Sequence, residues 1–119
     1  MNGRRGPAPE AAATPGVNTL SITGTLVEPP QQRTTPAGIP ITRFVLQHRS
    51  EQREAGQRRQ VECRLRVVAA GSPLAERCAG LRQGEAVQVH GFLARAGYRA
   101  PELKTELHAL AVEPVPNER

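Results

Sequence analysis

The segment Gln60–Val67, QVECRLRV, carries the clearest structural pattern in the sequence. Its apolar side chains, Val61, Cys63, Leu65 and Val67, alternate with the polar or charged side chains of Gln60, Glu62, Arg64 and Arg66. Because successive side chains of a strand point to opposite faces, this period of two predicts a strand with an apolar buried face and a basic exposed face. Cys63 lies in this strand pattern and Cys78 on an expected helix face, so both are predicted to be buried as small hydrophobic residues.

Strands of the same kind are predicted on both sides of this segment, over residues 19–27, 39–48, 86–95 and 103–112. Gly24 in the middle of the first strand predicts a bulge or a tight bend. The connections over residues 31–37, 49–58 and 94–102 are expected to be loops, and the polar stretch 49–58 an exposed hairpin loop.

One short helix is expected between the third and fourth strands. Ser72 is the expected cap and Pro73 the first helical residue, where its missing N–H is not needed. Leu74, Cys78 and Leu81 would then share one face. The order β-β-β-α-β is that of an OB-fold, an all-β five-stranded Greek-key barrel that binds oligonucleotides. The turn in LRQGEAVQVHGF (residues 81–92) also favours this fold.

The two ends of the chain differ in composition from this unit. Residues 1–16 are rich in Gly, Pro and Ala without a large apolar side chain, so we expect a disordered N-terminal tail. Residues 114–119 are expected to form a flexible C-terminal tail, which leaves residues 17–113 as the folded domain. No stretch has the length of a membrane span or the pattern of a signal peptide, and two cysteines form no disulfide framework. We therefore expect a cytoplasmic protein without membrane contact.

The charge of the chain favours a polyanionic partner. Its 119 residues carry a net charge of +5, with fifteen Arg, one Lys, eleven Glu and no Asp. Residues 43–66 contain seven Arg and three Glu and therefore hold most of the excess. A GC-rich genome is one origin of such an Arg content, but guanidinium groups also bind phosphate in bidentate fashion whatever their origin. A basic patch of this kind predicts binding of nucleic acid.

The expected binding groove is the face of the second and third strands between two flanking loops. The side chains predicted to line it are Arg33, Arg49, Arg58, Arg59, Arg64, Arg66, Arg95, Tyr98, Arg99 and Lys104. Phe44 and Phe92 are expected in the core, which leaves Tyr98 as the only exposed aromatic ring for base stacking. We therefore expect sequence-tolerant, salt-sensitive binding of single-stranded DNA.

The sequence offers little for catalysis. His48, His90 and His108 fall in three different strands without metal-ligand spacing, and no nucleotide-binding glycine motif is present. We expect a binding protein without a cofactor or metal and not an enzyme. Two alternatives remain open, an RNA-binding OB domain and a protein-interaction adaptor between helicase and loader whose DNA binding is weak or incidental.

Several motifs resemble the primosomal replication protein N (PriB) family. They are TPAGIPITRFVLQHRS (residues 35–50), EAGQRRQVECRLRV (54–67), VHGFLA (89–94) and LHALAVE (107–113). The resemblance covers residues 18–113 and implies a homodimeric OB-fold that binds single-stranded DNA during restart of stalled replication forks. It also implies stimulation of the PriA helicase and assembly toward DnaT.

The resemblance also concerns individual positions. Arg49 belongs to the HRS motif of the family, and Arg99 and Lys104 stand where the family has lysines on a DNA-contacting loop. Gln57 and Glu62 stand where better-known members have aromatic residues, and Gly97 replaces a third lysine. These departures imply weaker DNA binding or compensation by the neighbouring arginines, and they favour the adaptor alternative.

Overall fold

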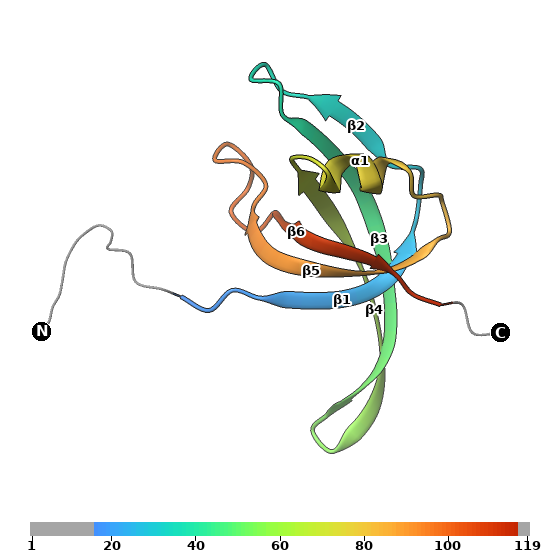
Figure 1. The fold of residues 1–119 in the computed structure, drawn as a ribbon. Helices are drawn as coiled ribbons and strands as arrows, with labels where there is room; N and C mark the ends of the chain where they lie inside the picture. The colour runs from blue at the N-terminus through green and yellow to red at the C-terminus, as the bar shows by residue number, and fades with distance from the viewer. Residues whose placement is uncertain (1–15, 117–119) are drawn as a thin grey trace, which may run out of the picture.

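Six strands and one short helix make up residues 16–116, the part of the chain that the computed structural model describes (Figure 1). The elements are β1 (Leu20–Leu26), β2 (Gln31–Thr34), β3 (Pro40–Glu54), β4 (Gln57–Ala70), α1 (Leu74–Ala79), β5 (Ala86–Arg95) and β6 (Thr105–Pro114). Most of the predicted tail regions, residues 1–15 and 117–119, lie outside the described residues. At the C-terminal end β6 continues through Pro114, one residue beyond the predicted end of the domain.

Five of the strands close into a barrel in the order β1-β5-β6-β4-β3. Closure comes from a short antiparallel pairing of β1 with β3, at Thr25↔Gln47 and Leu26↔Leu46. The single parallel contact, between β4 and β6, involves only Val67↔Leu107 and Val68↔His108. Helix α1 lies between β4 and β5 in the chain and contacts β3, β4 and β6. The predicted five-stranded OB barrel with one helix after its third strand is therefore confirmed.

Strand β2 corrects the prediction of a loop over residues 31–37. Gln31–Thr34 pairs with β3 from Gln31↔Arg43 to Thr34↔Pro40. All four residues of β2 are exposed, so the segment lacks the alternation of apolar side chains by which a strand is recognised. It lies outside the closed ring and widens the sheet beside β3.

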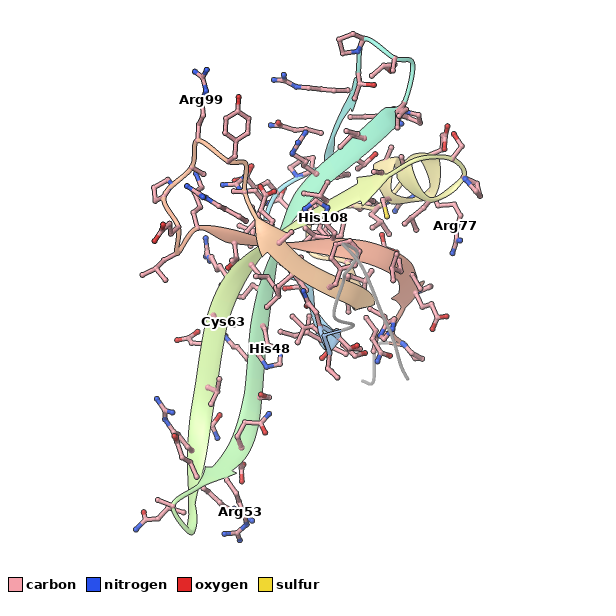
Figure 2. All side chains as sticks on the ribbon, turned by 90° about the vertical axis from the view of Figure 1, so that its left-hand side faces the viewer. His48, Arg53, Cys63, Arg77, Arg99 and His108 are labelled. Carbon is pink, nitrogen blue, oxygen red and sulfur yellow. The ribbon has the colours of Figure 1, made fainter. Side chains whose placement is uncertain are left out.

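The prediction of a hairpin loop over residues 49–58 is also wrong. Strands β3 and β4 pair continuously as far as Glu54↔Gln57, and only Ala55 and Gly56 form the turn. Both turn residues have positive φ angles, 55° and 78°, as a tight two-residue hairpin requires. The outer part of this pair, residues 47–64, projects from the barrel as a two-stranded ribbon, with Arg53 close to its tip (Figure 2). Because most of this ribbon is solvated on both faces, residues 49–58 have no apolar alternation.

The ribbon explains why Cys63 is exposed, contrary to the prediction. The alternation of the segment 60–67 is real, but the barrel core covers only its C-terminal end, where Val67 is fully buried. Leu65 packs against the core and Val61 is half-buried, whereas Cys63 lies on the projecting part. Cys78 on α1 is buried as predicted.

Helix α1 begins at Leu74, and Ser72 does not cap it, which corrects a further prediction. The N-cap position is occupied by Pro73, so Ser72 lies one residue too early to cap the helix, and its hydroxyl donates to Glu76 Oε2 at 2.7 Å. The helix buries Ala75 and Cys78, while Leu74 packs at the margin of the core. The Thr42 hydroxyl donates to the Ala75 carbonyl at 2.6 Å and joins β3 to α1.

Two glycines permit close contacts between strands. A Cβ atom on Gly24 would lie 2.5 Å from the carbonyl oxygen of Gln47, at the point where β1 closes the barrel against β3. The register shift of the sheet occurs instead between β5 and β6, where His90 and Gly91 face Ala111 and Ala109 and Leu110 is the extra residue of β6. There a Cβ atom on Gly91 would lie 1.9 Å from the His108 carbonyl oxygen, so no other residue fits without movement of the backbone.

We predict that Gly91→Ala destabilises the barrel by more than about 2 kcal/mol, because β5 and β6 must separate to admit a methyl group. Urea denaturation followed by circular dichroism measures this change. Gly80→Ala is the matched control, since its Cβ would make an ordinary contact of 3.6 Å at a residue in helical conformation. Equal stability of the two variants would contradict the close contact.

Candidate nucleic-acid interface

The strand register places most of the basic side chains on one face of the sheet. Even-numbered residues of β3, such as Phe44 and Leu46, point into the core, and Val67 of β4 does the same. Odd-numbered β3 residues and even-numbered β4 residues therefore point outward, and paired residues share a side. We call this surface the outer face. Its arginines are Arg33 of β2, Arg43, Arg49 and Arg53 of β3, and Arg58, Arg64 and Arg66 of β4.

Half of the ten predicted binding residues lie on this face, namely Arg33, Arg49, Arg58, Arg64 and Arg66, but Arg59 does not. It lies on the opposite face of the ribbon, where it pairs with Glu54. The remaining four are Arg95, the last residue of β5, and three residues of the loop that joins β5 to β6, namely Tyr98, Arg99 and Lys104. The Arg95 guanidinium is occupied within this loop, since its Nε donates to the Ala100 carbonyl at 3.0 Å.

The loop 96–104 presents an exposed cation and ring together. The Arg99 guanidinium lies 5.8 Å from the centre of the Tyr98 ring, and the Tyr98 residue is 82% exposed. Figure 2 shows Arg99 at the opposite end of the molecule from Arg53. A polyanion that contacted both would therefore cross the length of the outer face.

Glutamates on the ribbon pair with some of these arginines. Arg49 Nε lies 3.1 Å from Glu62 Oε1, and Arg58 Nε lies 3.0 Å from Glu51 Oε2. Both arginine side chains remain about three-quarters exposed, and pairs of this kind contribute roughly 0–1 kcal/mol. A phosphate group can therefore replace the carboxylate at small cost.

Other arginines of the outer face have no such partner. Among the described residues no carboxylate pairs with Arg33, Arg43 or Arg64. Arg64 Nε donates to the Gln47 side-chain oxygen at 2.7 Å, which aligns the guanidinium across the ribbon without neutralising its charge.

A small pocket lies where β2 and the chain before it meet the outer face. Its volume is about 130 Å³, and Arg43 and Arg66 supply two guanidinium groups to its wall beside the carboxylate of Glu28. Arg43 was not among the predicted binding residues. The sequence does indicate this residue, because Arg43 and Arg49 lie an even number of residues apart in one strand and therefore point to the same face.

An aromatic surface was also missed, because Phe92 was predicted to lie in the core. Phe92 is 37% exposed, and its ring stacks on His108 with a centroid distance of 5.4 Å and an interplanar angle of 5°. Val87 and Val89 occupy the inward positions of β5, so alternation alone directs Phe92 outward. The apolar nature of the side chain outweighed this signal in the prediction.

The stacked pair continues the outer face across β6 and β5. His108 is paired with Val68, and Val68 with Arg43, so one row leads from the ring of Phe92 to a guanidinium. Glu106 is only 8% exposed beside this row, with Oε2 3.9 Å from Arg66 Nε and Oε1 4.0 Å from His108 Nε2. Rings and cations of this kind together suit a chain of phosphates and unpaired bases.

The two histidines with defined contacts, His48 and His108, have structural roles. His48 makes 2.7 Å hydrogen bonds to the Thr23 carbonyl and the Ser50 hydroxyl, which ties the base of the ribbon to β1. Within residues 16–116 no three His, Cys or acidic side chains are grouped as metal ligands. No helix in the same range is long and apolar enough to cross a membrane.

Comparison with known proteins identifies the family. Residues 18–109 match a family described as another single-strand binding protein family. The replication restart protein PriB of Photorhabdus laumondii is 40% identical over 96 residues, covering 81% of this chain and 91% of that protein. This chain belongs to the PriB family. Its fold also superposes on PriB from Ralstonia solanacearum with a TM-score of 0.72 and 32% identity, over 83% of this chain and 98% of that structure.

Membership in the PriB family confirms the resemblance seen in the sequence. The structure gives the positions of Gln57 and Glu62, the two ribbon residues for which the resemblance implies aromatic side chains. Glu62 lies on the outer face, beside Gln47, Arg49 and Arg64. Gln57 is paired with Glu54 and lies on the opposite face near the turn. Of the two positions, only Glu62 therefore places a negative charge on the basic surface.

We predict that Glu62→Gln raises the affinity for single-stranded DNA by about three- to tenfold, because it releases Arg49 and removes a charge that repels phosphate. Fluorescence anisotropy with labelled oligo(dT) at low salt measures this effect. Glu113→Gln is the control, since it makes the same charge change on an exposed residue of β6 outside the outer face. An equal gain in both variants would assign the effect to net charge alone.

Proposed function

We propose that this PriB-family protein binds single-stranded DNA along the outer face during replication restart. The observation that supports it is the convergence of seven arginines, from β2, β3 and β4, on one face that also carries the Phe92–His108 stack. Strands and not loops position these groups, so the surface needs little reorganisation on binding.

The physical basis of binding is electrostatic with a smaller contribution from stacking. Each guanidinium that contacts a phosphate releases condensed counterions, which makes the affinity depend strongly on salt. Phe92 and Tyr98 offer faces on which unpaired bases stack, each worth roughly 1–3 kcal/mol. Neither interaction reads a base sequence, so sequence-tolerant binding is expected.

Replacing Arg64 and Arg66 together by Glu is predicted to weaken binding of oligo(dT) more than about 50-fold. A salt titration of the native protein should give a slope of log affinity against log salt of about −3 if about four phosphates are contacted. Arg82→Glu is a control for net charge, because Arg82 is exposed on the connection between α1 and β5. An affinity that does not change with salt, or that falls equally in Arg82→Glu, would contradict the proposal.

The same titration with RNA of equal length separates DNA from RNA binding. The outer face offers guanidinium groups and rings, and no described contact is arranged specifically for a 2′-hydroxyl. We therefore expect affinities within a few-fold of each other, with the biological choice made by the protein partners.

A protein-interaction adaptor is the second candidate. It is supported by the pairing of Glu51, Glu54 and Glu62 with ribbon arginines, which lowers the net charge of the ribbon. In that case the outer face would bind the PriA helicase and DnaT, the partners that the family resemblance implies, and DNA contact would be incidental. The Arg64→Glu/Arg66→Glu variant separates these functions. It should lose DNA binding in either case, and it should still bind the protein partners only if they contact residues other than those that contact DNA.

The proposal includes a homodimer formed through β1. Strand β1 pairs with β5 along its length but with β3 only at Thr25 and Leu26. Among the described residues the other edge of Leu20–Gly24 has no strand partner, so its backbone groups can pair with a second copy, apart from the Thr23 carbonyl, which is bonded to His48. Light scattering at micromolar concentration should give twice the chain mass of 12.8 kDa, and a monomer mass would contradict this assembly.

A further inference from the structure

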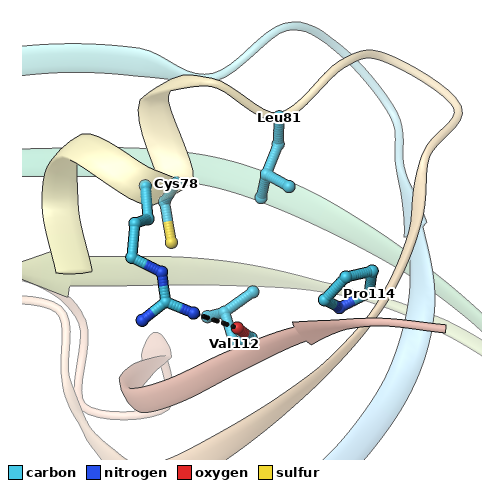
Figure 3. Close-up of a pocket in the computed structure, with 5 residues that line it drawn as sticks. Cys78, Leu81, Val112 and Pro114 are labelled. Carbon is cyan, nitrogen blue, oxygen red and sulfur yellow. Dashed lines mark hydrogen bonds between the residues drawn. The ribbon is translucent and has the colours of Figure 1, made fainter.

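A second cavity lies between α1 and the end of β6 and shares no residue with the outer face. It has a volume of about 290 Å³ and is lined by Arg77, Cys78, Leu81, Val112 and Pro114 (Figure 3). We call it the α1–β6 pocket. Its size is near the lower limit of ligand pockets, which suits the end of a peptide and not a whole domain surface.

The walls of the α1–β6 pocket are apolar. Cys78 and Val112 are almost fully buried, and Leu81 and Pro114 complete the lining. Burial raises the pKa of the Cys78 thiol to about 11, against the opposing effect of the Arg77 charge, so the group is an uncharged thiol at neutral pH. The thiol therefore acts as apolar surface and not as a nucleophile.

The pocket also adjoins an unpaired strand edge. Strand β6 pairs with β5 as far as Pro114, but β4 pairs with it only at Leu107 and His108. Among the described residues, no strand covers the edge of residues 109–114 that faces away from β5. The Val112 carbonyl on the pocket side accepts a hydrogen bond from Arg77 Nη2 at 3.4 Å. Extended peptides bind such edges by adding a strand.

Arg77 provides the one charge of the pocket. Its long bond to Val112 is the only hydrogen bond that its side chain makes with a described residue, and none of the described carboxylates pairs with it. The dashed line in Figure 3 marks this hydrogen bond, which joins Arg77 of α1 to Val112 of β6 beside the cavity. The remaining N–H groups match the geometry of a carboxylate.

We propose that the α1–β6 pocket binds the C-terminal end of a partner polypeptide. The apolar last side chain enters the cavity, the terminal carboxylate pairs with Arg77, and the preceding residues lie along the free edge of β6. Charge complementarity selects a carboxylate, and the apolar walls select the side chain beside it. Since the pocket is separate from the outer face, the peptide and single-stranded DNA can be bound together.

The test is a fluorescence anisotropy titration with a labelled peptide, Asp-Glu-Ser-Val-Leu with a free C-terminal carboxylate. We expect a dissociation constant in the micromolar range and at least about tenfold weaker binding of the same peptide with an amidated end. Equal binding of the acid and the amide, or no saturation at about 1 mM peptide, would overturn the proposal.

Arg77→Gln should weaken the free-acid peptide at least about fivefold while the affinity for oligo(dT) and the melting curve stay the same. Arg53→Gln is a closely matched control for the peptide, because Arg53 also donates one 3.4 Å hydrogen bond to a backbone carbonyl, that of Gly56, but lies at the ribbon tip. Amide chemical shifts of the native protein give an independent readout. Changes at Cys78, Leu81 and Val112 support the site, and changes confined to the outer face overturn it.

Discussion

The register between β3 and β4 is the constraint on which the surface of this protein depends. Fourteen residue pairs, from Ile41↔Ala70 to Glu54↔Gln57, hold the two strands together from the barrel to the ribbon tip. A slip of one residue would exchange the two faces of a strand and move its arginines to the other side. The core prevents this, because Phe44, Leu46 and Val67 must remain inside. Burial in the barrel thus orients charged side chains on the ribbon, where no core exists.

Charge and rigidity act together on the outer face. The glutamates that pair with Arg49 and Arg58 lower the repulsion between neighbouring guanidinium groups in the free protein. Because these pairs are exposed, they cost little to exchange for phosphate contacts. Arg43 and Arg66 differ, since they line the pocket near β2, and the Arg66 side chain is 48% exposed against 75% for Arg49. We therefore expect DNA binding at the barrel end of the face to cost less side-chain conformational entropy than DNA binding at the ribbon end.

The parts of the fold that follow from sequence are those in which one face of a strand is buried. Strand β5 occupies residues 86–95, as its alternation of valines predicts, and the helix appears between the expected strands. The ribbon and β2 could not be found in this way, because solvent on both faces removes the apolar period. Cys63 shows the limit within a single strand, since correct alternation does not tell where the core ends.

The binding surface was predictable to a similar extent and for a related reason. Arg64 and Arg66 follow from alternation alone, whereas Arg59 required the position of the turn at Ala55 and Gly56 to be known. Phe92 is exposed although it is apolar, because its position in β5 alternates with the buried Val87 and Val89. Ser72 is not the cap because the helix begins one residue later than the sequence predicts, which puts Pro73 at the N-cap position.

Strand β6 contributes residues to both surfaces and is held in one position against β5. His108, near its start, supports the ring of Phe92 on the outer face, and Val112, near its end, lines the α1–β6 pocket. Between them Ala109 is buried beside the bulge at Gly91, where the backbones of β5 and β6 are in closest contact. A shift of β6 along its axis would force a clash at this contact. A ligand bound at one surface should therefore not move the residues of β6 that form the other surface. The free energies of binding at the two sites should therefore be additive, as they are for distant sites without a shared mobile element.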